Sequence, residues 1–173
     1  MNERKITKAD LDSDNFLKED SLEFNGNVIF DENLGYVKIK KSIKLTGYLL
    51  IGAGTGIEAG TGIKAGTGIK AGWGIKAGEG IKAGWGIEAG DGIEAGTGIK
   101  AGWGIEAGDG IKAGEGIEAG EGIVTFRFGG IIAKFVSAMR IAVGFNITEE
   151  QEIRAEIRKG IVILGIIVEN KVV

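Results

Sequence analysis

The chain has 173 residues and a formal net charge of −3, with 33 glycines and no proline, cysteine or histidine. This charge predicts no general attraction to nucleic acid or to anionic membranes. The missing residue types exclude disulfides, thiolate chemistry, a histidine base, histidine-ligated zinc and a Ser-His-Asp arrangement.

Residues 1–23 are a polar, charged arm. Thr7 followed by Asp10 has capping-box character, which predicts a short helix over Lys8–Phe16. A disordered arm is the alternative. The charged start, Met1–Lys5, does not have the pattern of a signal peptide, so we expect a cytoplasmic protein.

Residues 24–50 have the composition of short strands separated by turns. Their last part, Tyr36–Leu50, contains a single glycine, Gly47, in place of the frequent glycines of the stretch that follows, and we interpret it as a first, irregular coil. Terminal repeats of an array are expected to be atypical, because an uncapped end exposes strand edges to association.

Residues 51–123 repeat the unit Gly-Ile-(Lys/Glu)-Ala-Gly-(Thr/Trp/Glu/Asp) almost without error. Side chains alternate in an extended segment, so isoleucine and alanine point inward and the charged residue between them points outward. The following Gly-X-Gly, for example 60–62, indicates a corner, because glycine is weak in strands and accepts positive φ. A period this short predicts a mainly β fold, a single-chain β-solenoid of stacked parallel strands.

Residues 124–173 are apolar and lack the repeat. Val124–Phe128 alternates as a strand. Ile131, Phe135 and Met139 have helical spacing, but residues 129–145 also fit the alternation of a strand. We favour a helix over Ile131–Arg140 followed by a strand, then a capping box at Thr148 and Gln151 and a second helix over Glu149–Lys159. The segment would then be a small α+β cap that closes the solenoid, or an oligomerisation module.

The repeat resembles the hexapeptide-repeat, left-handed β-helix family, in which three six-residue segments form a triangular coil of about eighteen residues. Ile39 and Leu45 fall in phase with Ile51, so the match covers 39–123. The chain departs from the family pattern two places before the isoleucine, where a small residue is usual. Here that position holds Thr, Trp, Asp or Glu, and a flatter coil of about twelve residues is the alternative.

On an eighteen-residue coil the outward charges form columns. Glu58, Lys76, Glu94 and Lys112 would alternate in sign, whereas Lys64, Lys82 and Lys100 would form a column of like charge. Trp85 would lie directly beside Trp103. Acidic residues at other corners are too few per turn for a calcium site, and we expect no metal, cofactor or catalytic residue.

The candidate partner-binding residues are Trp73, Trp85, Trp103, Lys64, Lys82 and Lys100. An exposed tryptophan at a corner marks a protein contact or a sugar platform, unless it only packs over glycine backbone. We expect a non-enzymatic binding scaffold with a protein partner, self-associating through its carboxyl-terminal segment, with no direct contact to nucleic acid or membrane.

Two more specific hypotheses follow from resemblance. The chain looks like pentapeptide-repeat solenoids, which implies that it could be an inhibitor from a phage or mobile element. It would then block a host protein that handles nucleic acid, in the host cytosol. The alternative is a structural, self-assembling β-helix, similar to bactofilin filaments or phage fibres.

Overall fold

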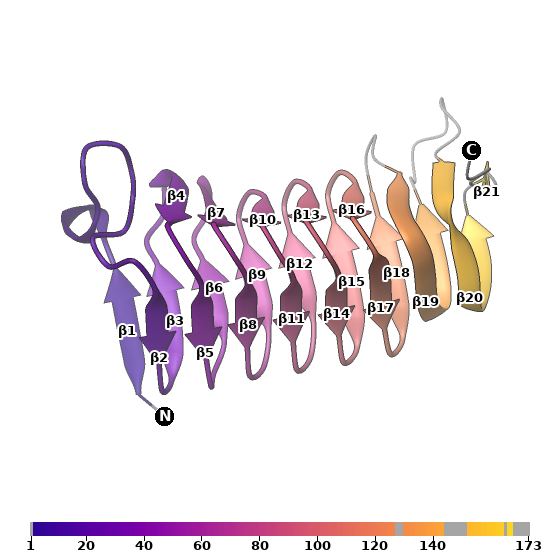
Figure 1. Ribbon diagram of the computed structural model, residues 1–173, viewed down its shortest axis with the longest axis horizontal. Coiled ribbons are helices and arrows are strands. Elements are labelled where there is room, and N and C mark those ends of the chain that lie inside the picture. The colour runs from indigo at the N-terminus through magenta and orange to yellow at the C-terminus, as the bar shows by residue number, and fades with distance from the viewer. Residues whose placement is uncertain (1, 127–129, 144–151, 165, 168–173) are drawn as a thin grey trace.

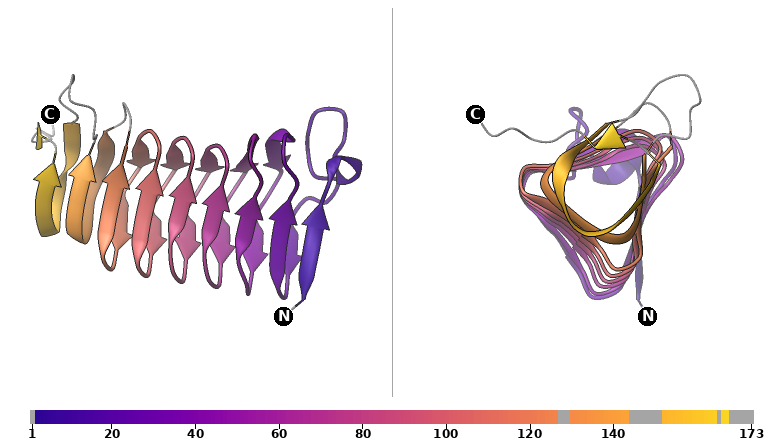
Figure 2. Two further views of the ribbon diagram at one scale, coloured as in Figure 1. Left: turned by 180° about the vertical axis from the view of Figure 1, so that it is seen from behind. Right: turned by 90° about the vertical axis from the view of Figure 1, so that its right-hand side faces the viewer.

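The computed structural model describes residues 2–126, 130–143, 152–164 and 166–167. This part of the chain winds as a parallel β-solenoid, with its first and last strands at opposite ends of the long axis (Figure 1). Seen along that axis, the coils stack as a triangle (Figure 2). The predicted fold class, a mainly β solenoid, is confirmed.

Three faces run the length of the solenoid, and strands on one face pair with each other in parallel. The first face contains β4 (Gly35–Ile39), β7 (Thr55–Ala59), β10 (Ile75–Ala77), β13 (Ile93–Ala95) and β16 (Ile111–Ala113). The second face contains β2 (Leu22–Phe24), β5 (Ile43–Leu45), β8 (Ile63–Ala65), β11 (Ile81–Ala83), β14 (Ile99–Ala101) and β17 (Gly116–Ala119). The third face contains β1 (Glu3–Ile6), β3 (Asn27–Phe30), β6 (Leu49–Ile51), β9 (Ile69–Ala71), β12 (Ile87–Ala89), β15 (Gly104–Ala107) and β18 (Gly122–Thr125).

The strand register confirms the longer of the two predicted coils. Ile57 pairs with Ile75, and Ile75 with Ile93, so three six-residue units complete one coil. The twelve-residue alternative is wrong. The isoleucines and most alanines of the repeat are buried and form one continuous core, while the corner residue of each unit lies outside it. This placement explains how tryptophan fits the repeat.

The coils before Ile57 follow a different phase from the one expected. Ile39 and Ile51 pair with Ala59 and Ala71, so they occupy the alanine positions of the later coils. The shift arises at 52–54, where the corner is longer and Gly54 has a φ of +68°. Buried Thr55 holds this corner: its hydroxyl donates a hydrogen bond to a backbone carbonyl and accepts one from a backbone N–H.

Close contact between coils, and not backbone conformation, requires glycine at the first of the two glycine positions in a regular corner such as 84–86. Positive φ occurs among the described glycines only at Gly26, Gly35, Gly54 and Gly160, none of which lies in the regular repeat after Ile57. A Cβ on Gly84 would lie 2.1 Å from the carbonyl oxygen of Gly66. On Gly86 it would lie 3.5 Å from the carbonyl oxygen of Gly104, an ordinary contact. The positive-φ explanation of the corners is therefore wrong.

The amino-terminal arm is part of the solenoid. Its strand β1 pairs with β3, and the expected helix over Lys8–Phe16 is reduced to the single 3-10 turn η1 (Lys8–Asp10). The Thr7 backbone N–H donates to the Asp10 carboxylate at 2.8 Å. Further along, Asp12 accepts hydrogen bonds from two backbone N–H groups, which competes with helix formation. Leu11 and Leu17 are buried in the core.

The carboxyl-terminal segment continues the coil as two long strands, β19 (Ile131–Val143) and β20 (Glu152–Leu164), followed by β21 (Ile166–Ile167). Strand β19 pairs in turn with β16, β17 and β18, so it passes along all three faces. The helices expected over Ile131–Arg140 and over the described part of Glu149–Lys159 are wrong. Burial alternates along both strands, and the last regular coil offers a ladder of backbone hydrogen bonds to β19. Thr148 and Gln151 lie outside the described residues.

Candidate binding surface

The six predicted partner-binding residues lie in three separate places. Trp85 and Trp103 share the corner between the second and third faces, which we call the tryptophan edge. Trp73 lies at the corner between the third and first faces. The lysines form a column on the second face, where Lys82 pairs with both Lys64 and Lys100. The sequence therefore indicated the right kind of exposure but not one common site.

Trp85 and Trp103 lie one coil apart at the tryptophan edge. Their ring centroids are 5.9 Å apart and their planes meet at 15°, so the indoles stack. The Trp103 backbone N–H donates to the Trp85 carbonyl at 3.0 Å, which fixes both residues on the corner. The side chains remain 59% and 61% exposed. The predicted pairing of these residues on an eighteen-residue coil is confirmed.

A groove of about 470 Å³ runs beside these rings on the third face. Its aromatic and aliphatic wall includes Tyr48 and Leu50 in addition to the two indoles, and its charged residues are Lys70, Glu88, Glu106 and Glu121. The Lys70 ammonium lies 2.6 Å from the Glu88 carboxylate. The Tyr48 hydroxyl donates a hydrogen bond to Glu3, which raises the pKa of Tyr48. The lining of the groove therefore combines exposed aromatic and aliphatic side chains with three carboxylates and one ammonium group.

Trp73 has a different environment. Its ring packs against Tyr36, with centroids 5.7 Å apart and planes at 48°, and its side chain is 39% exposed. The backbone N–H of Trp73 bonds to the carbonyl of Thr55, at the elongated corner. This tryptophan covers the junction between the irregular and regular coils, which favours a packing role.

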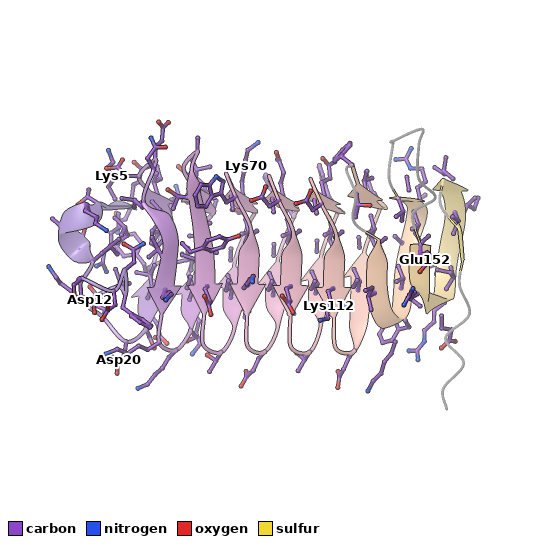
Figure 3. The ribbon with its side chains drawn as sticks, turned by 90° about the horizontal axis from the view of Figure 1, so that it is seen from above. Lys5, Asp12, Asp20, Lys70, Lys112 and Glu152 are labelled. Atoms are coloured by element: carbon purple, nitrogen blue, oxygen red, sulfur yellow. The ribbon has the colours of Figure 1, made fainter. Side chains whose placement is uncertain are left out.

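The lysine column on the second face continues through Lys44 and ends at carboxylates on both sides. Lys44 lies 3.1 Å from Glu23, and Lys100 lies 2.6 Å from Glu118. Within the described part of the chain, Lys64 and Lys82 form no ion pair. The first face instead alternates Glu58, Lys76, Glu94 and Lys112, as predicted. Lys112 and Lys70 project from different faces, as Figure 3 shows.

Three further exposed apolar residues extend the tryptophan edge toward the end of the solenoid. Met139 is 58% exposed where β19 rounds this corner, next to Arg140, whose backbone N–H donates to the Glu121 carbonyl. Arg140 pairs with Ile161, which is 70% exposed, and Ile163 follows on the third face at 61%. From the sequence, the apolar residues of this segment were expected in a cap or an oligomer interface. Side chains alternate along a strand, so the positions of Ile161 and Ile163 on either side of Val162 could have predicted that these two isoleucines point to the same face.

Two other kinds of site are absent from the described residues. No helix among them has the length and apolar character needed to cross a membrane. No group of three or more acidic side chains in the same ranges has the geometry to hold a metal ion.

Comparison of the chain with protein-family models, with curated proteins and with solved structures finds no match.

Proposed function

We propose that this chain is a rigid, non-enzymatic scaffold that binds a protein partner along the tryptophan edge. One observation carries the proposal: most of the large apolar side chains that lie exposed in the described structure are at this corner or on the adjoining end of the third face. They are Trp85, Trp103, Met139, Ile161 and Ile163. Aromatic residues and methionine are enriched in protein interfaces, and exposed apolar side chains grouped among polar residues mark an interaction site. Along this corner Glu121 lies between Trp103 and Met139.

The solenoid supports this role because it holds the edge in place before a partner arrives. Each corner residue is bound to the coil before it by a backbone hydrogen bond, and the indoles of Trp85 and Trp103 support each other. A partner therefore loses little free energy in ordering the surface it contacts. Large, rigid aromatic side chains at such positions are typical binding hot spots.

A polymer built by end-to-end stacking is less well supported. The amino-terminal end has Leu11 and Leu17 inside the core. Its short strand β1 carries Arg4 and Lys5, which form ion pairs with Glu19 and Asp31. Short, charged edge strands oppose pairing with another chain. Exposed Ile161 and Ile163 lie at the other end only, which favours a discrete assembly over open-ended growth.

The test compares how much partner protein is captured by the wild-type chain, by the W85T/W103T variant and by the W73T variant. Threonine already occupies corner positions of this repeat, at Thr61 and Thr67, so the replacements suit the local backbone. A captured protein must then be purified and its affinity measured against all three chains. We expect W85T/W103T to weaken binding by at least about tenfold and W73T to leave it unchanged. Equal affinity for the wild type and W85T/W103T would overturn the proposal.

A further inference from the structure

The groove beside the tryptophan edge has a charge pattern that the fold does not require. Glu88 pairs directly with Glu106 on the neighbouring strand of the third face. Like charges in directly opposite positions destabilise a sheet. The first face avoids this arrangement by alternating signs, although it is built from the same six-residue unit.

The positive charge in the groove is insufficient to balance its carboxylates. Among the described residues of its lining Lys70 is the only basic one, and it is bound to Glu88 at 2.6 Å. Within the described ranges, Glu106 and Glu121 form no ion pair. Both line the groove together with Trp85 and Trp103. Two carboxylates therefore face the same space as two exposed indoles.

We propose that this groove binds an arginine-bearing basic segment of the protein partner; this inference rests on the function proposed above. A guanidinium group is planar, stacks on aromatic faces and binds carboxylates through two parallel hydrogen bonds. It can therefore contact both the indoles and the carboxylates that line the groove. A neutral sugar could stack on the indoles but would leave the repulsion between Glu88 and Glu106 uncompensated.

The chain already uses such contacts elsewhere. The Arg158 guanidinium carbon lies 3.9 Å from the centroid of the Phe135 ring, on the second face. Lys38 lies over the ring of Phe16 at 5.3 Å. In both cases a cation covers an aromatic ring on the outside of the solenoid. The indoles of the tryptophan edge have no cation over them among the described residues.

The test titrates the full chain with tetra-arginine amide and follows the indole N–H signals of the three tryptophans by NMR. W73F, W85F and W103F assign the signals. We expect the Trp85 and Trp103 signals to shift and the Trp73 signal to stay. E106Q/E121Q should weaken binding about tenfold, because both lost contacts are charge-assisted. The matched control is E58Q, which changes the same repeat position on the first face.

Tetra-citrulline amide, a neutral peptide of the same shape, and cellotetraose are the comparison ligands. The inference is overturned if tetra-arginine does not shift the Trp85 and Trp103 signals, or if E106Q/E121Q binds it as well as the wild type does. It is also overturned if cellotetraose shifts the two signals and tetra-arginine does not. Each of these results leaves the proposed function intact as long as W85T/W103T still loses its protein partner. Failure of the proposed function has a different result: W85T/W103T and the wild type would bind the protein partner with equal affinity.

Discussion

The indole rings of Trp85 and Trp103 stack with centroids 5.9 Å apart, although a whole coil of chain separates the two residues. The stack forms because the coil length returns the chain to the same corner, and the strands on either side of that corner are in register. One repeated sequence thus builds a uniform core, while its single variable corner position places unlike side chains on the surface.

The glycines on either side of Trp85 should differ in their tolerance of a side chain. Gly84→Ala places a Cβ 2.1 Å from the Gly66 carbonyl oxygen, whereas Gly86→Ala places it 3.5 Å from the nearest atom. We expect Gly84→Ala to lower the free energy of unfolding by about 1–3 kcal/mol or more. Gly86→Ala should change it by less than about 0.5 kcal/mol. Urea denaturation measures both, and equal losses would contradict the assigned packing.

Charge reversal should have opposite effects on the first and second faces. Lys82→Glu places a carboxylate between the ammonium groups of Lys64 and Lys100. Lys76→Glu places one between Glu58 and Glu94. We expect Lys82→Glu to raise the free energy of unfolding and Lys76→Glu to lower it, each by about 0.2–1 kcal/mol.

Salt provides the control for this pair of variants. At about 1 M NaCl the Debye length is about 3 Å, so both changes should shrink toward zero. Effects of the same sign on the two faces, or effects that persist at high salt, would show that the columns do not interact as the register implies.

The amino-terminal cap should weaken in acid. The backbone N–H of Thr7 is the main cause that lowers the pKa of Asp10, and the Arg4 side chain is the main cause that lowers the pKa of Glu19. A carboxyl group with a lowered pKa stabilises the fold above its unfolded pKa, and this contribution is lost as the pH falls through the folded pKa. We expect the loss below about pH 4.

The D10N/E19Q variant isolates this effect. Urea denaturation at about pH 7 and about pH 3 should show a smaller acid-induced loss of stability in the variant than in the wild type. An equal loss in both chains would mean that other carboxyl groups control the acid response.

Self-association should depend on the exposed isoleucines of the last coil. We expect light scattering to give a discrete oligomer for the wild type and a smaller species for I161S/I163S. These two are the most exposed aliphatic side chains of the described carboxyl-terminal strands, so their burial would stabilise an interface most. I132S is the matched control, since Ile132 is 45% exposed on the first face. A monomeric wild type, or growth without limit at rising concentration, would contradict this prediction.

The six-residue period made the solenoid, the inward isoleucines and the Trp85–Trp103 pairing predictable, because a strict repeat allows few ways to bury its apolar face. It could not reveal the longer corner at 52–54. Ile39 and Ile51 keep the six-residue spacing across it while occupying alanine positions. The spacing of isoleucines along the sequence does not give their positions in the coil there, because the corner is longer while the six-residue spacing around it is unchanged.

The carboxyl-terminal strands were misassigned for a related reason. Ile131, Phe135 and Met139 have helical spacing, and local spacing carries no information about the neighbouring coil. Strand β19 follows the ladder of β16 to β18, and this tertiary pairing overrides the local pattern. The groove residues Tyr48, Glu106 and Glu121 were missed because they meet only when the coils stack.

If the tryptophan edge is a contact surface that the fold does not need, removing its indoles should leave the fold nearly as stable. The free energy of unfolding of W85T/W103T tests this most directly. Losing the indole stack should cost no more than about 0.5–1.5 kcal/mol. Ile87→Ala, which empties a buried core position on the adjacent strand, should cost about 2–5 kcal/mol and serves as the reference. A loss in W85T/W103T as large as that of Ile87→Ala would make the tryptophans part of the fold and contradict the account.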